Sequence, residues 1–434
     1  MRSDQQQAIN RLAGTSATAF LCAVLCVYPL YIDKFSNLGV TKFTGCFTLF
    51  LLFLLWLVAC TAIGARAPRP RNANAGRDVT LWGVLAFAGT SLISTFTSLS
   101  PTASTWGLGG YYGGLMLVLF TAAGYWAVRS YLDLENLDFV FWVLGITTSI
   151  VAVLYVLNIF NIDLIGAYAD TAVVERAQFF STLGQKDFNG CFFSVALPIV
   201  FYQFLNAKDT RTAVWTGIPA VFGALALAVV DSEALALGIG AAVMVLVCHK
   251  NFTTRHLRRA ALISAAFFGW AAWMHYMRAS VYTQGGTALL AKLGAWQVAL
   301  PCMAASLLLW LVLFVLARKG IAAQAPLYLP GRVITIAVLA VGALAFVLAN
   351  AMPNLPLPES LHNLLVFNDD WGTYRGVAWR AAFGTWADGS LLRKIVGIGP
   401  GMMHTAVAAW AGDAMTARMA TFYAAHNEYL EQLL

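Results

Sequence analysis

Charged side chains are scarce in this sequence, at 11% of residues against about 25% in soluble globular domains. Hydrophobic side chains make up 60% of its 434 residues. This balance excludes a soluble globular protein and indicates a polytopic membrane protein. The net charge of +7 comes without a basic patch interleaved with aromatic residues, so we expect no nucleic-acid partner.

Other missing patterns exclude further classes. The seven cysteines show no CxxC or Cys/His spacing, so we interpret them as small apolar packing residues and expect no metal site. Gly397-Ile-Gly399-Pro400-Gly401 fails as a dinucleotide fingerprint because Pro400 breaks the spacing, and we expect no cofactor. The first apolar run continues into Tyr31-Ile-Asp-Lys34 without a small-residue cleavage site, so the first helix should remain.

Long apolar runs recur along the chain and predict an all-α polytopic membrane protein with about 11–12 transmembrane helices. A span needs about 20 mostly apolar residues. The runs are 14–32, 42–63, 79–98, 113–129, 138–158, 189–206, 213–230, 233–249, 260–276, 295–317 and 333–350. We therefore expect a helical scaffold over 1–350, a large extracytoplasmic loop over 351–426, and the start of a final helix, cut off by the chain end, over 427–434.

The short links between the runs predict the orientation. With the N-terminus in the cytoplasm, 16 of the 27 Lys and Arg residues fall in inner links, and five of the remaining 11 lie in the long final loop. We expect a multi-pass protein of the inner or plasma membrane, surrounded by the lipid bilayer. The N-terminus should be cytoplasmic and any active site extracytoplasmic.

The third outer link, 161–189, gathers charges and amides before an apolar helix. Arg176 and Lys186 supply cations beside a helix N-terminus, which suits an anion site, although a solvated loop with a capping amide fits equally. Asp231 lies in a very short link between two apolar runs. An acid so close to hydrocarbon is functional by default and should have a basic partner, unless the turn is simply hydrated.

The final loop contains a predicted helix over 376–388, ended by Asp388-Gly389. Trp379, Ala382, Phe383 and Trp386 recur at helical spacing, so one face should be apolar while Arg380 points elsewhere. Arg375 would lie at its N-terminal end. Trp379, Arg380 and Glu428 are further candidate substrate contacts. His426 opens the last segment, where it is either a structural residue or a general base.

The order of these motifs resembles that of the bacterial O-antigen ligase/polymerase superfamily, which includes O-antigen ligases, surface-polysaccharide polymerases and protein O-oligosaccharyltransferases. The matching segments, from the third outer link onward, are the Arg176 to Gly184 link, Arg375-Gly-Val-Ala-Trp379, Gly397-Ile-Gly-Pro-Gly401 and His426-Asn-Glu-Tyr-Leu430. Each motif is short, so their joint order carries the resemblance. The chain departs from the family at Gly184-Gln185 and Asp187, where the family often has Gly-Asn and a further Asn.

The resemblance implies the fold of integral-membrane glycosyltransferases that use lipid-linked glycans, together with a function and its residues. A glycan would move from a polyprenyl-diphosphate carrier to a hydroxyl of a glycan, lipid or protein, without metal or nucleotide sugar. Arg176 and Arg375 would bind the donor diphosphate, and His426 would activate the acceptor. A transporter or flippase for a lipid-linked anionic glycan remains the alternative, since it would use the same arginines without a base.

Overall fold

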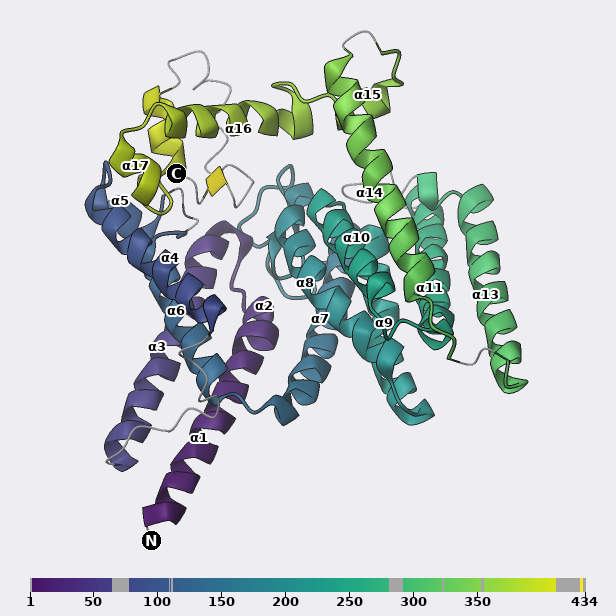
Figure 1. Cartoon of the computed structure of the whole chain (residues 1–434), viewed down its shortest axis with the longest axis horizontal. Helices are drawn as coiled ribbons and strands as arrows, with labels where there is room; N and C mark the ends of the chain where they lie inside the picture. The colour runs from purple at the N-terminus through teal and green to yellow at the C-terminus, as the bar shows by residue number, and fades with distance from the viewer. Residues whose placement is uncertain are drawn as a thin grey trace. The chain divides into compact units, whose positions relative to one another are not determined.

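The structure is a computed structural model, and it is mostly helical (Figure 1). It describes residues 2–64, 78–108, 110, 112–280, 292–321, 324–352, 355–410 and 430–431. Within these ranges the named strands are β1 (Phe179–Phe180) and β2 (Gly184–Gln185), which pair antiparallel in one short hairpin. The predicted all-α class is confirmed.

Each of the eleven apolar runs falls on a helix. Their bounds are α1 (Arg2–Cys22), α3 (Leu38–Gly64), α4 (Val79–Phe96), α6 (Leu115–Tyr131), α7 (Leu137–Ile159), α8 (Lys186–Asn206), α9 (Thr210–Val229), α10 (Glu233–Cys248), α11 (Thr254–Ser280), α13 (Trp296–Arg318) and α14 (Tyr328–Ala351). A π-helical turn (Ala23–Val27) and α2 (Tyr28–Leu30) continue α1, and the short α5 (Pro101–Trp106) precedes α6. Runs of about 20 apolar residues favour helices because a helix satisfies its own backbone hydrogen bonds in lipid.

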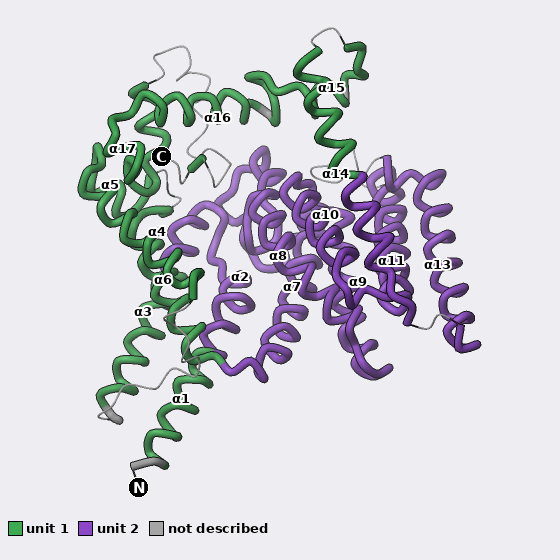
Figure 2. Tube along the Cα trace, viewed as in Figure 1, with its two compact units in different colours: residues 1–17, 46–132, 338–434 green, residues 18–45, 133–337 purple. Residues whose placement is uncertain are grey.

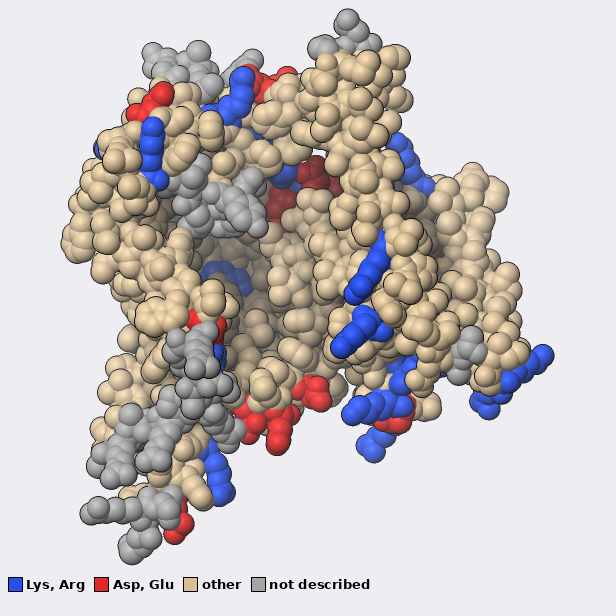
Figure 3. Space-filling model, viewed as in Figure 1, with Lys and Arg blue, Asp and Glu red and all other residues tan. Residues whose placement is uncertain are grey.

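Eight helices over the described ranges are long and apolar enough to cross a membrane. The eight segments are Asp4–Leu30, Phe35–Ala62, Val79–Phe96, Leu134–Ile159, Lys186–Asn206, Thr210–Val229, Trp296–Arg318 and Tyr328–Ala351. Of the other predicted spans, α6 and α10 are shorter and α11 is more polar. Side chains that are neither acidic nor basic cover most of the face in Figure 3, as expected for a protein in a lipid bilayer.

Contacts divide the chain into two compact units, and each is described by itself (Figure 2). Unit 1 comprises 1–17, 46–132 and 338–434, and unit 2 comprises 18–45 and 133–337. In unit 2, Phe193 and Leu197 of α8 are fully buried and pack against side chains of α7, α9 and α11, including Val151, Leu225 and Met274. This core fixes where the ends of these helices lie.

The region after α14 contains α15 (Glu359–Leu365), α16 (Trp371–Ala387) and α17 (Leu391–Val396). The predicted helix is confirmed as α16, with Asp388 at its C-cap, although it begins five residues earlier than expected. Its fully buried residues are Val377, Ala378, Ala381 and Ala382. Of the expected apolar face, Ala382 is buried and Trp379 and Trp386 pack against the same cluster, whereas Phe383 is 54% exposed. The spacing therefore identified both the helix and most of the side that packs, and small alanines on that side allow a close approach.

Candidate functional site

A polar pocket in unit 2 lies where the ends of several apolar helices meet. Its volume is about 220 Å³. The lining residues come from the ends of α7, α9 and α11, the α9–α10 link, the hairpin, the 3-10 turn (Arg176–Gln178) before it and the start of α8: Tyr155, Ile159, Ala177, Gln178, Phe180, Gln185, Lys186, Val229, Asp231 and Arg278. Ionisable side chains at the edge of apolar helices are costly to place there and commonly mark a functional site.

Buried side chains hold the hairpin before α8: Asn158 accepts from the Ser181 N–H, and Asn189 makes several hydrogen bonds to it. Asn189 Nδ2 donates to the carbonyl oxygens of Phe180, Gly184 and Gln185 at 3.0–3.2 Å, and its Oδ1 accepts from the Ser181 hydroxyl at 2.6 Å. The turn also needs a left-handed backbone at Gly184, where φ is 83°. Asn158 and Asn189 therefore fix the hairpin from which Gln185 and Lys186 enter the pocket.

Replacing Asn189 by alanine should strongly destabilise unit 2. The substitution leaves a buried hydroxyl and three carbonyl groups without their partner, and we expect a loss of about 3 kcal/mol. Thermal unfolding of the purified protein measures this, with the exposed Asn251→Ala as the matched control. A midpoint for Asn189→Ala within about 2 °C of the wild type would show that the hairpin does not depend on this side chain.

The charges of the pocket are two basic groups and one acid. Lys186 Nζ lies 3.7 Å from Asp231 Oδ2, and the two side chains are 48% and 42% exposed. A pair this exposed is worth only about 0–1 kcal/mol, so it does not lock Lys186 in place. The prediction that Asp231 has a basic partner is confirmed.

Arg278 brings the second positive charge, at the end of α11. Its Nε is buried and has no hydrogen-bond partner over the described ranges. A buried cationic donor without a partner is energetically unfavourable, and a bound anion would satisfy it. The pocket is therefore better suited to an anion than to a neutral ligand.

Close packing of α8 against the start of α10 brings the pocket residues together. A Cβ on Gly190 would lie 2.2 Å from Ser232 Oγ, so only glycine allows this approach. Ser232 also donates to Asp187 Oδ1 at 3.0 Å. Two further lining residues, Tyr155 and Phe180, stack with their ring centroids 4.7 Å apart. The pocket thus combines cations, amides and a flat aromatic surface.

Arg176, one of the two predicted diphosphate ligands, does not line this pocket, although Ala177 and Gln178 do. Its guanidinium lies 5.4 Å from the centre of the Tyr168 ring, and its Nε donates to the Thr171 carbonyl at 3.4 Å. Burial raises the pKa of the Tyr168 hydroxyl, which donates to the Phe179 carbonyl. In this structure Arg176 stabilises the loop that leads into the hairpin.

Unit 1 contains the other predicted residues that the structure describes. Arg375 is half-buried in the first turns of α16, where φ is positive at Gly372 and Tyr374. Arg380 pairs with Asp369. Trp379 packs on Trp371, with ring centroids 5.0 Å apart. Arg176 and Arg375 belong to different units, so their joint action on one diphosphate remains a prediction.

His426 and Glu428 lie outside the described residues. The nearest described residue is Leu430, which packs against a cluster in unit 1 formed by α16 and residues 398–407. The glycine-rich segment Gly397-Ile-Gly-Pro-Gly401 adopts a left-handed backbone at its three glycines, with φ of 85°, 107° and 71°. A Cβ on Gly401 would lie 3.2 Å from the Cα of Gly107, so two glycine-rich segments far apart in sequence pack together.

In comparisons with known proteins, no protein family, no curated protein and no solved structure matches this chain. Within the part of the chain that the structure describes, no three His, Cys, Asp or Glu side chains form a group that could hold a metal ion. Chemical interpretation of the site therefore rests on its own residues.

Proposed function

We propose that this chain is a membrane glycosyltransferase, which moves a glycan from a polyprenyl-diphosphate carrier to an acceptor hydroxyl on the outer face of the membrane. The observation that carries the proposal is the pocket with Lys186 and Arg278 at the ends of apolar helices. A lipid-linked diphosphate has its charge at the membrane edge and its chain in the hydrocarbon, which matches cations placed at this level.

The chemistry of transfer explains why the pocket would need both cations. The carrier diphosphate leaves when the glycosidic bond to it breaks, and its negative charge increases in the transition state. A guanidinium can bind two phosphate oxygens at once, and Lys186 can add a flexible point charge. In the absence of donor, Asp231 neutralises Lys186; donor phosphate would compete with this weak pair.

The acceptor side of the reaction is assigned to unit 1 residues. An alcohol is a poor nucleophile until its proton is removed, and a neutral imidazole within hydrogen-bond reach is a suitable base. We assign this role to His426, and an electrostatic role toward the leaving group to Arg375. Arg380 and Trp379 have intramolecular partners in the structure, so we give them a structural role in supporting α16.

Orientation is a part of this proposal that can be tested separately. Reporter fusions after Arg71, Lys250 and Lys319 should report cytoplasm, and fusions near Asp170 and Asn363 should report the outside, because short basic links stay on the cytoplasmic side. Paired reporters that are active on opposite sides of the membrane measure this. An outside signal at Lys250 would place the pocket on the cytoplasmic side and would exclude the proposed transfer at the outer face.

The experiment that tests the function is glycan transfer from a purified lipid-diphosphate donor by the reconstituted protein. A transferase forms a new bond between glycan and acceptor and releases the polyprenyl diphosphate. A transporter or flippase, using the same pocket, would move the donor across the bilayer with its glycan still attached.

A further inference from the structure

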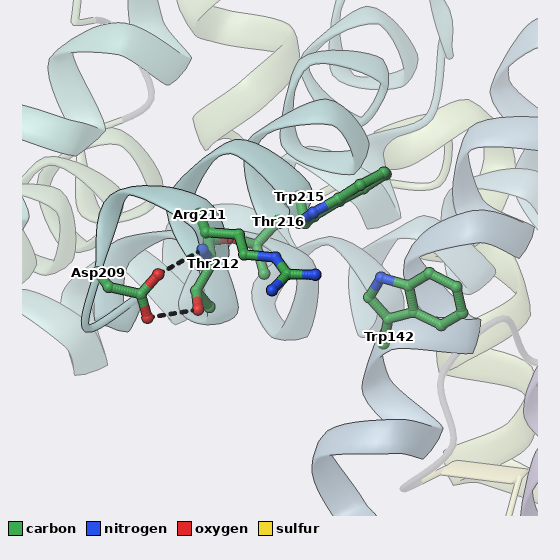
Figure 4. A pocket seen from close by; sticks show the side chains of 6 residues that line it. All are labelled: Trp142, Asp209, Arg211, Thr212, Trp215 and Thr216. Atoms are coloured by element: carbon green, nitrogen blue, oxygen red, sulfur yellow. Dashed lines mark hydrogen bonds between the residues drawn. The ribbon is translucent and has the colours of Figure 1, made fainter.

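A second cavity of unit 2 lies at the other ends of α7 and α9. The pocket described above is lined by the last turns of these helices, whereas this cavity is lined by their first turns. It is an open groove of about 700 Å³. Its lining residues are Trp142 of α7, and Asp209, Arg211, Thr212, Trp215 and Thr216 at the start of α9 (Figure 4).

The acid in this groove is already engaged. Asp209 caps α9: its Oδ1 accepts from the Thr212 N–H at 2.9 Å and its Oδ2 from the Thr212 hydroxyl at 2.7 Å. The hydrogen bond from the Thr212 backbone lowers the pKa of the Asp209 carboxyl, which therefore stays ionised at neutral pH. The cap also occupies the backbone donor at this helix end, so a ligand would be bound by side chains.

Arg211 is the side chain left to bind one. Its guanidinium has no ion pair or hydrogen bond to another described residue, and it extends toward Trp142 and Trp215 (Figure 4). These tryptophans are 42% and 55% exposed. A planar cation next to exposed indole rings can bind a phosphate while stacking on an aromatic face.

The position of the groove indicates what it would bind. It lies at the ends of two candidate membrane spans, Leu134–Ile159 and Thr210–Val229, and tryptophan is enriched where headgroups meet hydrocarbon. One turn further along each helix, α7 and α9 are in close contact, since a Cβ on Gly145 of α7 would lie 3.1 Å from the Cβ of Pro219 of α9. The groove is therefore open beside the polar end of the spans and narrows toward the hydrocarbon.

We propose that this groove binds an anionic phospholipid of the surrounding membrane, with its phosphate on Arg211 and its glycerol region between Trp142 and Trp215. The acyl chains would then follow α7 and α9 into the bilayer. This binding is separate from the proposed transfer reaction and from its donor, because the groove and the donor pocket lie at opposite ends of the same helices. It would hold the first turns of α7 and α9 at the level of the headgroups.

Native mass spectrometry of the whole protein tests the proposal. The protein is exchanged into nanodiscs of phosphatidylglycerol and phosphatidylcholine with identical acyl chains, and the lipids retained after release are counted. We expect the wild type to retain phosphatidylglycerol preferentially and Arg211→Gln to reduce this retention about fivefold, the effect of one cation near a membrane surface. Arg211→Lys should give an intermediate loss, because it keeps the charge without the planar group.

Lys208→Gln is the matched control, since Lys208 is exposed at the same end of unit 2 but does not line the groove. It should retain phosphatidylglycerol as the wild type does. Equal losses in Lys208→Gln and Arg211→Gln would show a diffuse surface charge instead of a site. Equal retention of the two lipids by the wild type, or full retention by Arg211→Gln, would also overturn the proposal.

Discussion

Replacing Arg278 by glutamine should weaken the binding of a polyprenyl diphosphate about 100-fold. The substitution removes a guanidinium whose charge-assisted hydrogen bonds are worth about 1.5–3 kcal/mol each, and about 1.4 kcal/mol corresponds to a factor of ten. Arg278→Lys should lose about tenfold, because the charge remains and the bidentate geometry is lost. Titration of the purified protein with a short-chain polyprenyl diphosphate measures both.

Stability distinguishes a binding role of Arg278 from a structural one. The buried Nε has no partner among the described residues, so Arg278→Gln removes an unsatisfied group and should leave the unfolding midpoint unchanged or raise it. Arg258→Gln, at the other end of the same helix, is the matched control, and it should change neither donor binding nor the pocket. A lowered midpoint for Arg278→Gln, with donor binding intact, would make Arg278 a structural residue.

The sequence predicted the positions of the helices well, but it did not predict which residues the packing of these helices brings into contact. Long apolar runs identified all eleven helices because hydrophobic length is a local property. Asp231 was recognised as needing a basic partner, yet the choice of Lys186 depends on how closely α8 packs on α10 at Gly190. That approach is a tertiary contact, and no local pattern encodes its partner.

Arg278 and Arg176 show that the order of motifs along the chain does not predict which arginine side chains line the pocket. Arg278 follows an apolar run at 260–276 without a recognisable motif, and only the convergence of helix ends places it beside Lys186 and Asp231. An ionisable residue at the edge of a span was the available signal. Arg176 carries part of the family resemblance, but its side chain packs on Tyr168. The order of motifs says which residues recur, and the direction of each side chain depends on its packing.

Replacing His426 by alanine or glutamine should slow glycan transfer by roughly 10²–10⁴-fold, because the acceptor hydroxyl would lose its positioned general base. Transfer is measured from a lipid-diphosphate donor and normalised to folded protein. His362→Ala, an exposed histidine of α15, is the matched control and should transfer at the wild-type rate. Donor binding should be unchanged in the His426 variants, in contrast to Arg278→Gln.

Near-normal transfer by both His426 variants would show that another group accepts the proton of the acceptor hydroxyl. The sequence offers Glu428 and Asp231 as alternatives. A structural role gives a different pattern, with less folded protein but unchanged activity per folded molecule. The pH dependence adds a further readout. A general base must be unprotonated to accept the acceptor proton, so wild-type transfer should fall as the pH is lowered, and both His426 variants should lose this pH dependence.

The most direct test of the proposed function follows both products of a single turnover by the reconstituted wild-type protein. The donor is a polyprenyl diphosphate that carries a labelled glycan, and the acceptor is a glycan or lipid with a free hydroxyl. We predict that label appears on the acceptor while unlabelled polyprenyl diphosphate accumulates in equal amount, without added nucleotide sugar. Label that crosses the bilayer while still attached to its lipid, with no labelled acceptor, would contradict the transferase and identify a transporter.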